Sequence, residues 1–208
     1  MKIKKSLAAA LALSAGLMGT ATTQAAVINF DDLPSVEFAD AIANGYQGFD
    51  WSWFNYIDKF ALPNTGFEKG VVSGQYAAYN DFAATATTSG SLFDFNGAYL
   101  TAGWNDGLNI EVSGFVNGVV QYTKTVVVNT AHAQWFDFNF FGIDSLSFSA
   151  YGGERNPQLD NEGEHFILDN FTYNEPRPAT QVSEPSNLML IGLGIILLGV
   201  MTNRRKNI

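Results

Sequence analysis

The chain of 208 residues contains no cysteine and only two histidines, His132 and His165. The lack of cysteine excludes a disulfide framework, cysteinyl zinc sites, iron–sulfur clusters and thiol catalysis, and two histidines leave little for imidazole chemistry. Basic residues are also scarce, because 11 Lys and Arg stand against 20 Asp and Glu, for a formal net charge of −9. Nucleic-acid affinity comes largely from cations that neutralise phosphates, so this balance argues against nucleic acid as a partner.

The first 25 residues follow the pattern of a secretory signal peptide. A basic start with Lys2, Lys4 and Lys5 precedes an apolar run from Leu7 to Met18. The small residues before Ala26 favour cleavage after Ala25. An uncleaved anchor or a core helix is the alternative, which the short apolar run beside a basic terminus disfavours.

The last 25 residues carry a second signal with three parts. The sequence Ser183-Glu184-Pro185-Ser186 precedes an apolar run from Leu188 to Met201, and Arg204-Arg205-Lys206 follows it. We predict a transmembrane helix over residues 188–202. At ~1.5 Å per residue the apolar run spans only about 21 Å, short of the roughly 30 Å of hydrocarbon. The basic tail favours the cytoplasmic side, which leaves the preceding domain outside.

This tail resembles a PEP-CTERM sorting signal, although Ser183 stands where the family usually has its first Pro. The resemblance covers residues 184–208 and rests on Glu184, Pro185, Ser186, Arg204 and Arg205. It implies an exosortase-type protease as a partner, transient anchoring in the inner membrane, and release to the cell surface or extracellular matrix. It also implies association with exopolysaccharide and biofilm. An ordinary single-pass anchor is the alternative.

Removal of both signals leaves residues 26–184, which hold all 20 acidic residues and five basic ones, for a net charge of −15. Such a charge disfavours anionic polymers as direct ligands and suits divalent cations. Residues 175–183 are rich in Pro, Ala, Thr and Gln, which predicts an extended linker.

Residues 26–174 predict a single all-β domain. Short runs of Val, Phe, Tyr, Ile and Thr alternate with Gly, Asn, Asp and Pro, and no apolar period of a helix is present. The expected strands are 27–30, 49–54, 70–79, 92–95, 98–104, 108–115, 119–128, 134–140, 145–150 and 165–173. Asn117-Gly118 predicts a two-residue hairpin turn. We therefore expect two facing sheets in a jelly-roll-like β-sandwich.

The same stretch resembles the β-sandwich domains that many PEP-CTERM proteins carry. The resemblance rests on an opening phrase from Ile28 to Leu33 and a closing phrase from Phe166 to Phe171. It implies architecture more than activity.

Acidic residues at both ends of this domain form a candidate calcium site. If the first and last strands lie side by side, Asp31 and Asp32 approach Asp169 and Asn170, and Ca²⁺ takes six to eight such oxygens. The jelly-roll resemblance also implies a structural calcium where the terminal strands meet. The alternative is that these side chains accept backbone hydrogen bonds at strand ends and turns.

Three aromatic residues form a candidate ligand platform. In a continuous strand Trp51 and Trp53 share one face, where flat rings, with Tyr56 nearby, stack on sugar rings. The alternative is that these rings belong to the core of the sandwich.

Catalysis is not expected. The chain lacks a Gly-x-Ser-x-Gly elbow, and no pair among the 20 acids is singled out as the two carboxylates of a glycosidase. Our first hypothesis is a non-catalytic surface or matrix protein associated with exopolysaccharide. The second is a carbohydrate-binding module with or without calcium, and a secreted glycan hydrolase is the third.

Overall fold

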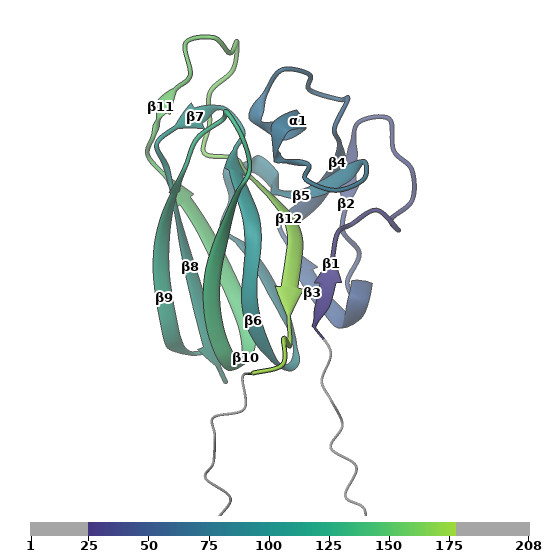
Figure 1. Ribbon diagram of the computed structural model, residues 1–208, viewed down its shortest axis with the longest axis vertical. Coiled ribbons are helices and arrows are strands. Elements are labelled where there is room, and N and C mark those ends of the chain that lie inside the picture. The colour runs from purple at the N-terminus through teal and green to yellow at the C-terminus, as the bar shows by residue number, and fades with distance from the viewer. Residues whose placement is uncertain (1–24, 178–208) are drawn as a thin grey trace, which may run out of the picture. The chain divides into compact units, whose positions relative to one another are not determined.

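The computed structural model describes residues 25–177, of which residues 25–175 form one compact unit (Figure 1). Ala25 is exposed just before the first strand. The other sorting residues, Glu184, Pro185, Ser186, Arg204 and Arg205, lie outside the described range. Within residues 25–177 no helix is long and apolar enough to cross a membrane.

The domain is an antiparallel, sandwich-like β-structure, which confirms the all-β prediction. Its strands are β1 (Ala26–Ile28), β2 (Ala39–Ala41), β3 (Phe49–Ser52), β4 (Phe54–Asp58), β5 (Tyr76–Asn80), β6 (Ala86–Ala102), β7 (Asn105–Asp106), β8 (Leu108–Val116), β9 (Val119–Val128), β10 (Gln134–Tyr151), β11 (Glu154–Arg155) and β12 (Phe166–Tyr173). The described helices are α1 (Gly66–Gly70) and the 3₁₀ turns η1 (Tyr46–Gly48) and η2 (Asp81–Ala83).

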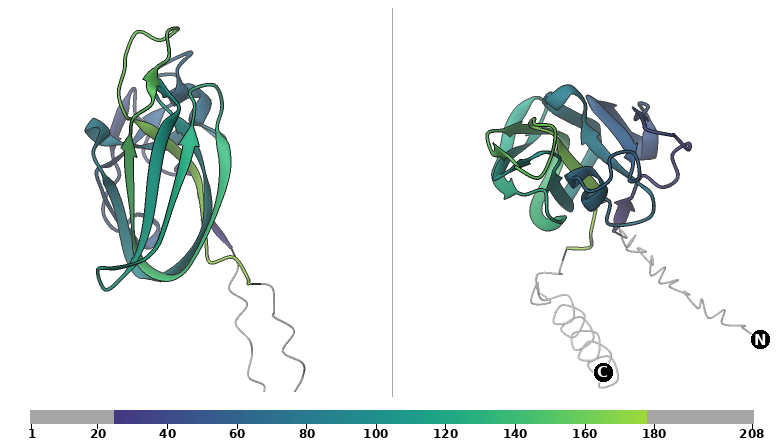
Figure 2. Two further views of the ribbon diagram at one scale, coloured as in Figure 1. Left: turned by 90° about the vertical axis from the view of Figure 1, so that its left-hand side faces the viewer. Right: turned by 90° about the horizontal axis from the view of Figure 1, so that it is seen from above.

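Ten strands form one continuous sheet instead of the two separate sheets that we expected. The order is β2-β4-β5-β12-β6-β10-β8-β9, with β1 beside β12 and β3 beside β6, while β7 and β11 form a separate pair. The continuity comes from β6 and β10, which are 17 and 18 residues long. We predicted two strands in place of each. The register between β10 and β6 shifts between Asp137 and Ser145, but the two strands stay paired on both sides of this stretch. Such β-bulges allow a long strand to bend without leaving its sheet, and the long strands are curved in Figure 2.

The turn at Asn117-Gly118 forms as predicted. Val116 pairs with Val119, and both turn residues have positive φ, at 50° and 74°. Asn and Gly tolerate this conformation better than other residues. One bulge between Gly114 and Phe115 shifts the register, which the alternating pattern did not reveal.

The first and last strands lie side by side, as expected. Ala26 pairs with Tyr173 and Ile28 pairs with Phe171. The start of β1 and the end of β12 therefore lie at one end of the domain, opposite to the end that carries α1, β7 and β11 (Figure 1). Any ligand site at that far end faces away from Ala26 and Tyr173.

Buried side chains form two clusters, one on each face of the layer made by β4, β5 and the start of β12. Tyr56, Ala78 and Leu168 belong to the main core, whereas their neighbours Ile57 and Ile167 belong to the second cluster. Because successive side chains of a strand point to opposite faces, this alternation separates the clusters. The second cluster also contains Phe67, Ala77, Tyr79, Trp104 and Leu159.

Helix α1 ends at Gly70, where we predicted that a strand over 70–79 begins. A loop over residues 71–75 follows, and β5 begins at Tyr76, so that prediction was wrong for the residues before Tyr76. Thr65 caps the helix by accepting a hydrogen bond from the Phe67 N–H at 3.2 Å. The glycines allow tight packing, because a Cβ on Gly66 would lie 1.7 Å from the Ala102 carbonyl oxygen, and one on Gly70 2.7 Å from Ile167. This close approach brings Phe67 onto the second cluster.

Candidate functional site

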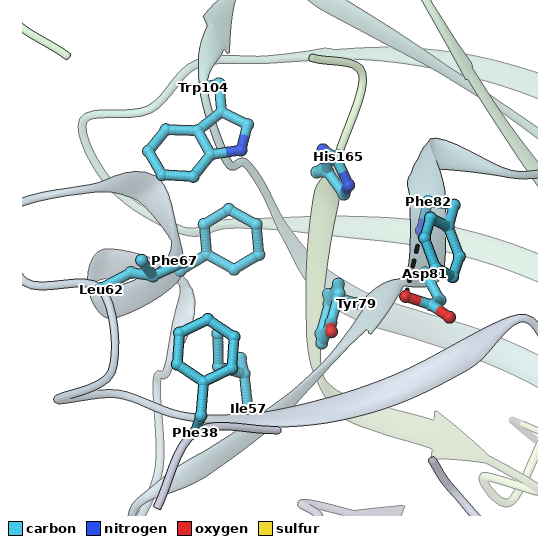
Figure 3. Close-up of a pocket in the computed structure, with 9 residues that line it drawn as sticks. All are labelled: Phe38, Ile57, Leu62, Phe67, Tyr79, Asp81, Phe82, Trp104 and His165. Carbon is cyan, nitrogen blue, oxygen red and sulfur yellow. Dashed lines mark hydrogen bonds between the residues drawn. The ribbon is translucent and has the colours of Figure 1, made fainter. Parts of the chain in front are cut away.

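A cavity of about 440 Å³ lies over the second cluster (Figure 3). Aromatic side chains form most of its wall: Phe38, Phe67, Tyr79, Phe82 and Trp104. Ile57 and Leu62 add apolar surface, and Asp81 and His165 add polar groups. A mostly apolar cavity with a few polar side chains is the usual composition of a small-molecule site, and its volume is within the usual range.

The centre of this wall is a set of rings around Phe67. Its ring centroid lies 5.2 Å from that of Trp104, 5.6 Å from that of Tyr79 and 6.0 Å from that of His165. These rings come from α1, the end of β6, β5 and the start of β12, so several elements hold them. Figure 3 shows them around one space. Packed rings of this kind present a rigid surface to a ligand.

The turn Asp81–Ala83 forms one side of the opening. Phe82 and Ala83 have positive φ of 51° and 55°, a conformation that costs energy for residues other than glycine. The Asp81 N–H donates to the Trp53 carbonyl at 2.9 Å, and the Ala84 N–H donates to the Asp81 carbonyl at 2.9 Å. This geometry leaves Phe82 80% exposed. An exposed phenyl ring on a strained turn beside a cavity is suited to contact with a ligand.

Burial affects two of the polar groups of the wall. Burial lowers the pKa of His165, which disfavours the charged imidazolium, and the charge of Asp81 opposes that shift. Its Nδ1 is shielded from solvent without a hydrogen-bond partner among the described residues. Burial raises the pKa of Tyr79, whose hydroxyl accepts a hydrogen bond from Asn55 at 3.3 Å. The wall therefore offers three polar side chains, those of Asp81, His165 and Tyr79.

The predicted platform of Trp51, Trp53 and Tyr56 does not form. Trp51 and Tyr56 are buried, whereas Trp53 is 55% exposed. The expected strand breaks at Trp53, whose φ of 59° interrupts the alternation between β3 and β4. Trp51 donates from its indole N–H to the Tyr46 carbonyl at 3.1 Å, and the Tyr56 hydroxyl donates to the Pro34 carbonyl at 2.9 Å. The core alternative is therefore correct for these two residues.

Trp53 nevertheless contacts the turn that forms one side of the cavity. Its carbonyl accepts the hydrogen bond from Asp81, which belongs to the cavity wall. The predicted platform thus includes one residue, Trp53, that contacts the wall of the cavity without lining the cavity itself.

The candidate calcium residues accept protein hydrogen bonds. Asp31 accepts from the N–H groups of Gln75 and Tyr76 at 2.7 and 3.2 Å. Asp169 accepts from those of Val72 and Ser73 at 2.7 and 2.9 Å. The two carboxylates thus both bind the segment that leads into β5.

The other two members of that set are also engaged. Asn170 accepts from the Ser73 hydroxyl at 2.8 Å, and Asp32 accepts from Gln47 at 2.7 Å and from the Tyr46 hydroxyl. Within residues 25–177 no group of three or more His, Cys, Asp or Glu side chains is arranged to hold a metal ion. The hydrogen-bonding alternative describes what these residues do in the structure.

The sequence pattern misses most of the cavity residues. It assigns Phe67 to no element, places Trp104 in a strand and gives His165 no role beyond the start of a strand. The sequence does hold one signal for the cavity. Trp104 is the last residue of one predicted strand and His165 the first of another, and residues at strand ends adjoin the loops that carry binding sites. The contact of α1 with β6 and β12 is not visible in the pattern.

Comparisons with known proteins found no matching family model and no matching curated protein. Among solved structures, the chain is similar to a DUF4465 family protein from Bacteroides caccae, at 14% identity and a TM-score of 0.49, over 73% of this chain and 99% of that one. A DUF4465 family protein from Bacteroides ovatus has 10% identity and a TM-score of 0.41, over 72% and 93% of the two chains. TmCBM61 in complex with β-1,4-galactotriose has 11% identity and a TM-score of 0.35, over 65% and 98%. Similarity at this level transfers no function to the chain.

Proposed function

We propose that the protein is a non-catalytic carbohydrate-binding module that takes a neutral sugar in the aromatic cavity. The observation that carries the proposal is the set of five aromatic side chains around one cavity of about 440 Å³, with Asp81 and His165 in the same wall. Aromatic faces stack on the C–H face of a sugar ring, and a few polar groups orient its hydroxyls.

The charges support a neutral ligand without hydrolysis. Among the cavity's lining residues in the range 25–177, Asp81 is the one carboxylate, whereas a typical glycosidase needs two across the scissile bond. The acidic domain disfavours uronic acids and other anionic polymers, because like charges repel.

The proposal includes export of the domain to the cell surface or matrix. It rests on the signal-peptide pattern of residues 1–25 and on the sorting pattern of residues 184–208. Trp104 and His165 of the cavity wall lie next to the Ala102–Phe166 pair at the start of β12, whereas Tyr173, after which the chain continues to the linker, lies at the other end of that strand. A domain tethered through its C-terminal linker would therefore present the cavity outwards.

The test is calorimetric titration of the full-length protein in a sugar-free detergent, after a screen on an array of neutral glycans. We expect Phe82→Ala to weaken binding of the best glycan by about fivefold, because stacking on one ring contributes roughly 1 kcal/mol. Asp81→Ala is expected to weaken it as well.

The matched control is Phe60→Ala. Phe60 is 67% exposed and, like Phe82, is a surface phenylalanine, but it does not line this cavity. If Phe60→Ala and Phe82→Ala change affinity equally, the cavity is not the site. If no neutral glycan binds the wild type, the proposed function is wrong.

A further inference from the structure

A second cavity of about 320 Å³ adjoins the aromatic one, and Leu62 and Trp104 belong to the walls of both. Its remaining wall comes from the segment before α1 and from the loop between β11 and β12. Polar side chains predominate there: Asn64, Thr65, Gln158, Asp160 and Asn161. The two neighbouring cavities thus differ in chemistry, one being aromatic and the other rich in amides.

The three amide side chains of this wall are available to a ligand. Within residues 25–177, the side chains of Asn64, Gln158 and Asn161 make no hydrogen bond to the protein; Asn64 and Gln158 bond only through their backbone N–H groups. Each side-chain amide carries two N–H donors and one carbonyl acceptor. Sugar hydroxyls also donate and accept, so amides are well matched to them.

The loop that carries Gln158 and Asn161 is held against Trp104. The Asn156 N–H donates to the Trp104 carbonyl at 3.0 Å, and the Leu159 N–H donates to the Asn156 carbonyl at 3.0 Å. The Gln158 N–H donates to Asn156 Oδ1 at 2.9 Å. These bonds within the protein hold the loop in place, which reduces the entropy cost of binding.

The opposite wall is held in the same way. The Thr65 hydroxyl donates to the Leu62 carbonyl at 2.6 Å, and the Asn64 N–H donates to Glu68 at 2.6 Å. The two cavities share Leu62 and Trp104, and the carbonyl of each accepts a hydrogen bond from the segment that forms the polar wall.

We infer that the two cavities are adjoining subsites for one neutral oligosaccharide of at least two sugar units, with Trp104 at their junction. The inference rests on the proposed function and extends it from a single sugar to a chain. One unit stacks in the aromatic cavity, and the hydroxyls of the next bond to Asn64, Gln158 and Asn161. Asp160 in the polar wall disfavours a negatively charged unit there.

The experiment titrates the full-length protein with β-1,4-linked gluco-, galacto-, manno- and xylo-oligosaccharides of one to five units. We expect affinity to rise about tenfold or more from one unit to two or three, since several neutral hydrogen bonds are added. The double variant Gln158→Ala/Asn161→Ala is expected to lose that rise while it binds the single sugar as the wild type does.

Gln121→Ala is the matched control, because Gln121 is an exposed glutamine on β9 that lines neither cavity. Unchanged thermal unfolding of each variant shows that the fold is intact. Affinity that does not rise with length, or an equal loss for one unit and for three in the double variant, overturns the second subsite and leaves the proposed function standing. Failure of every glycan to bind overturns both.

Discussion

The side chain of Asn80 holds the backbone on both sides of His165. Its Oδ1 accepts from the Phe166 N–H at 2.7 Å, and its Nδ2 donates to the Glu164 carbonyl at 3.2 Å. The same Nδ2 also donates to the Ala84 carbonyl at 3.2 Å, which ends the turn that carries Phe82. One fully buried amide therefore positions two sides of the cavity.

Asn80→Ala is expected to lower the free energy of unfolding by about 2–4 kcal/mol. The substitution leaves buried main-chain groups without partners, and each such group costs about 1–3 kcal/mol. Urea denaturation measures the change. Asn161→Ala is the control, because that exposed side chain makes no hydrogen bond in the described part of the chain. Equal stability of the two variants would contradict the positioning role.

Trp51 and Trp53 are expected to respond in opposite ways to replacement. Trp51→Ala should cost about 3–5 kcal/mol of stability, because the ring packs edge-on against Phe54 and Phe171 in the core. Trp53→Ala should change stability by no more than about 0.5 kcal/mol, since its ring is largely exposed. Thermal and urea unfolding of both variants test the burial assignment, and a large loss in Trp53→Ala would refute it.

Asp169 should make stability depend on pH. Burial raises its pKa to about 6, although backbone N–H groups of Ser73, Val72 and Asn170 partly oppose the shift. The folded state thus holds a proton more tightly than the unfolded state. The stabilisation is fully present below about pH 4 and is lost as pH rises through about 6.

The test compares wild type with Asp169→Asn between pH 4 and pH 7. A shift of about 2 pKa units corresponds to roughly 3 kcal/mol. The difference in unfolding free energy between the two proteins should therefore change by up to that amount over this range. Parallel pH profiles for the two proteins would show that Asp169 does not titrate there.

Removal of calcium is expected to leave the domain unchanged. Asp31 and Asp169 already accept main-chain hydrogen bonds from residues 72–76, which holds that loop without a cation. Thermal unfolding in excess EDTA and in millimolar Ca²⁺ should give the same midpoint. A midpoint raised by Ca²⁺ and lost in Asp31→Asn would restore the calcium prediction.

Glu184→Ala tests the sorting prediction in native cells. We expect a wild-type surface species that begins near Ala26 and ends near Glu184, and we expect Glu184→Ala or deletion of residues 188–208 to abolish it. Intact mass measurement of surface and medium fractions identifies the ends. A product that keeps the C-terminal apolar segment regardless of Glu184 would indicate a plain membrane anchor.

The sequence by itself determined the all-β class and the Asn117-Gly118 turn. Period-two alternation and turn residues are local signals, so they survive without knowledge of the rest of the chain. The acidic charge and the lack of cysteine likewise limit the possible chemistry, because both are properties of the composition alone.

Only the tertiary structure decided which aromatic rings face a ligand. Trp51 and Trp53 look equivalent in the sequence, yet a single positive φ at Trp53 places one ring in the core and the other in solvent. The cavity joins Phe67, Tyr79, Trp104 and His165, which are distant in sequence and meet because Gly66 and Gly70 let α1 approach β6 and β12 closely. Such contacts depend on packing between elements, and local periodicity carries no information about them.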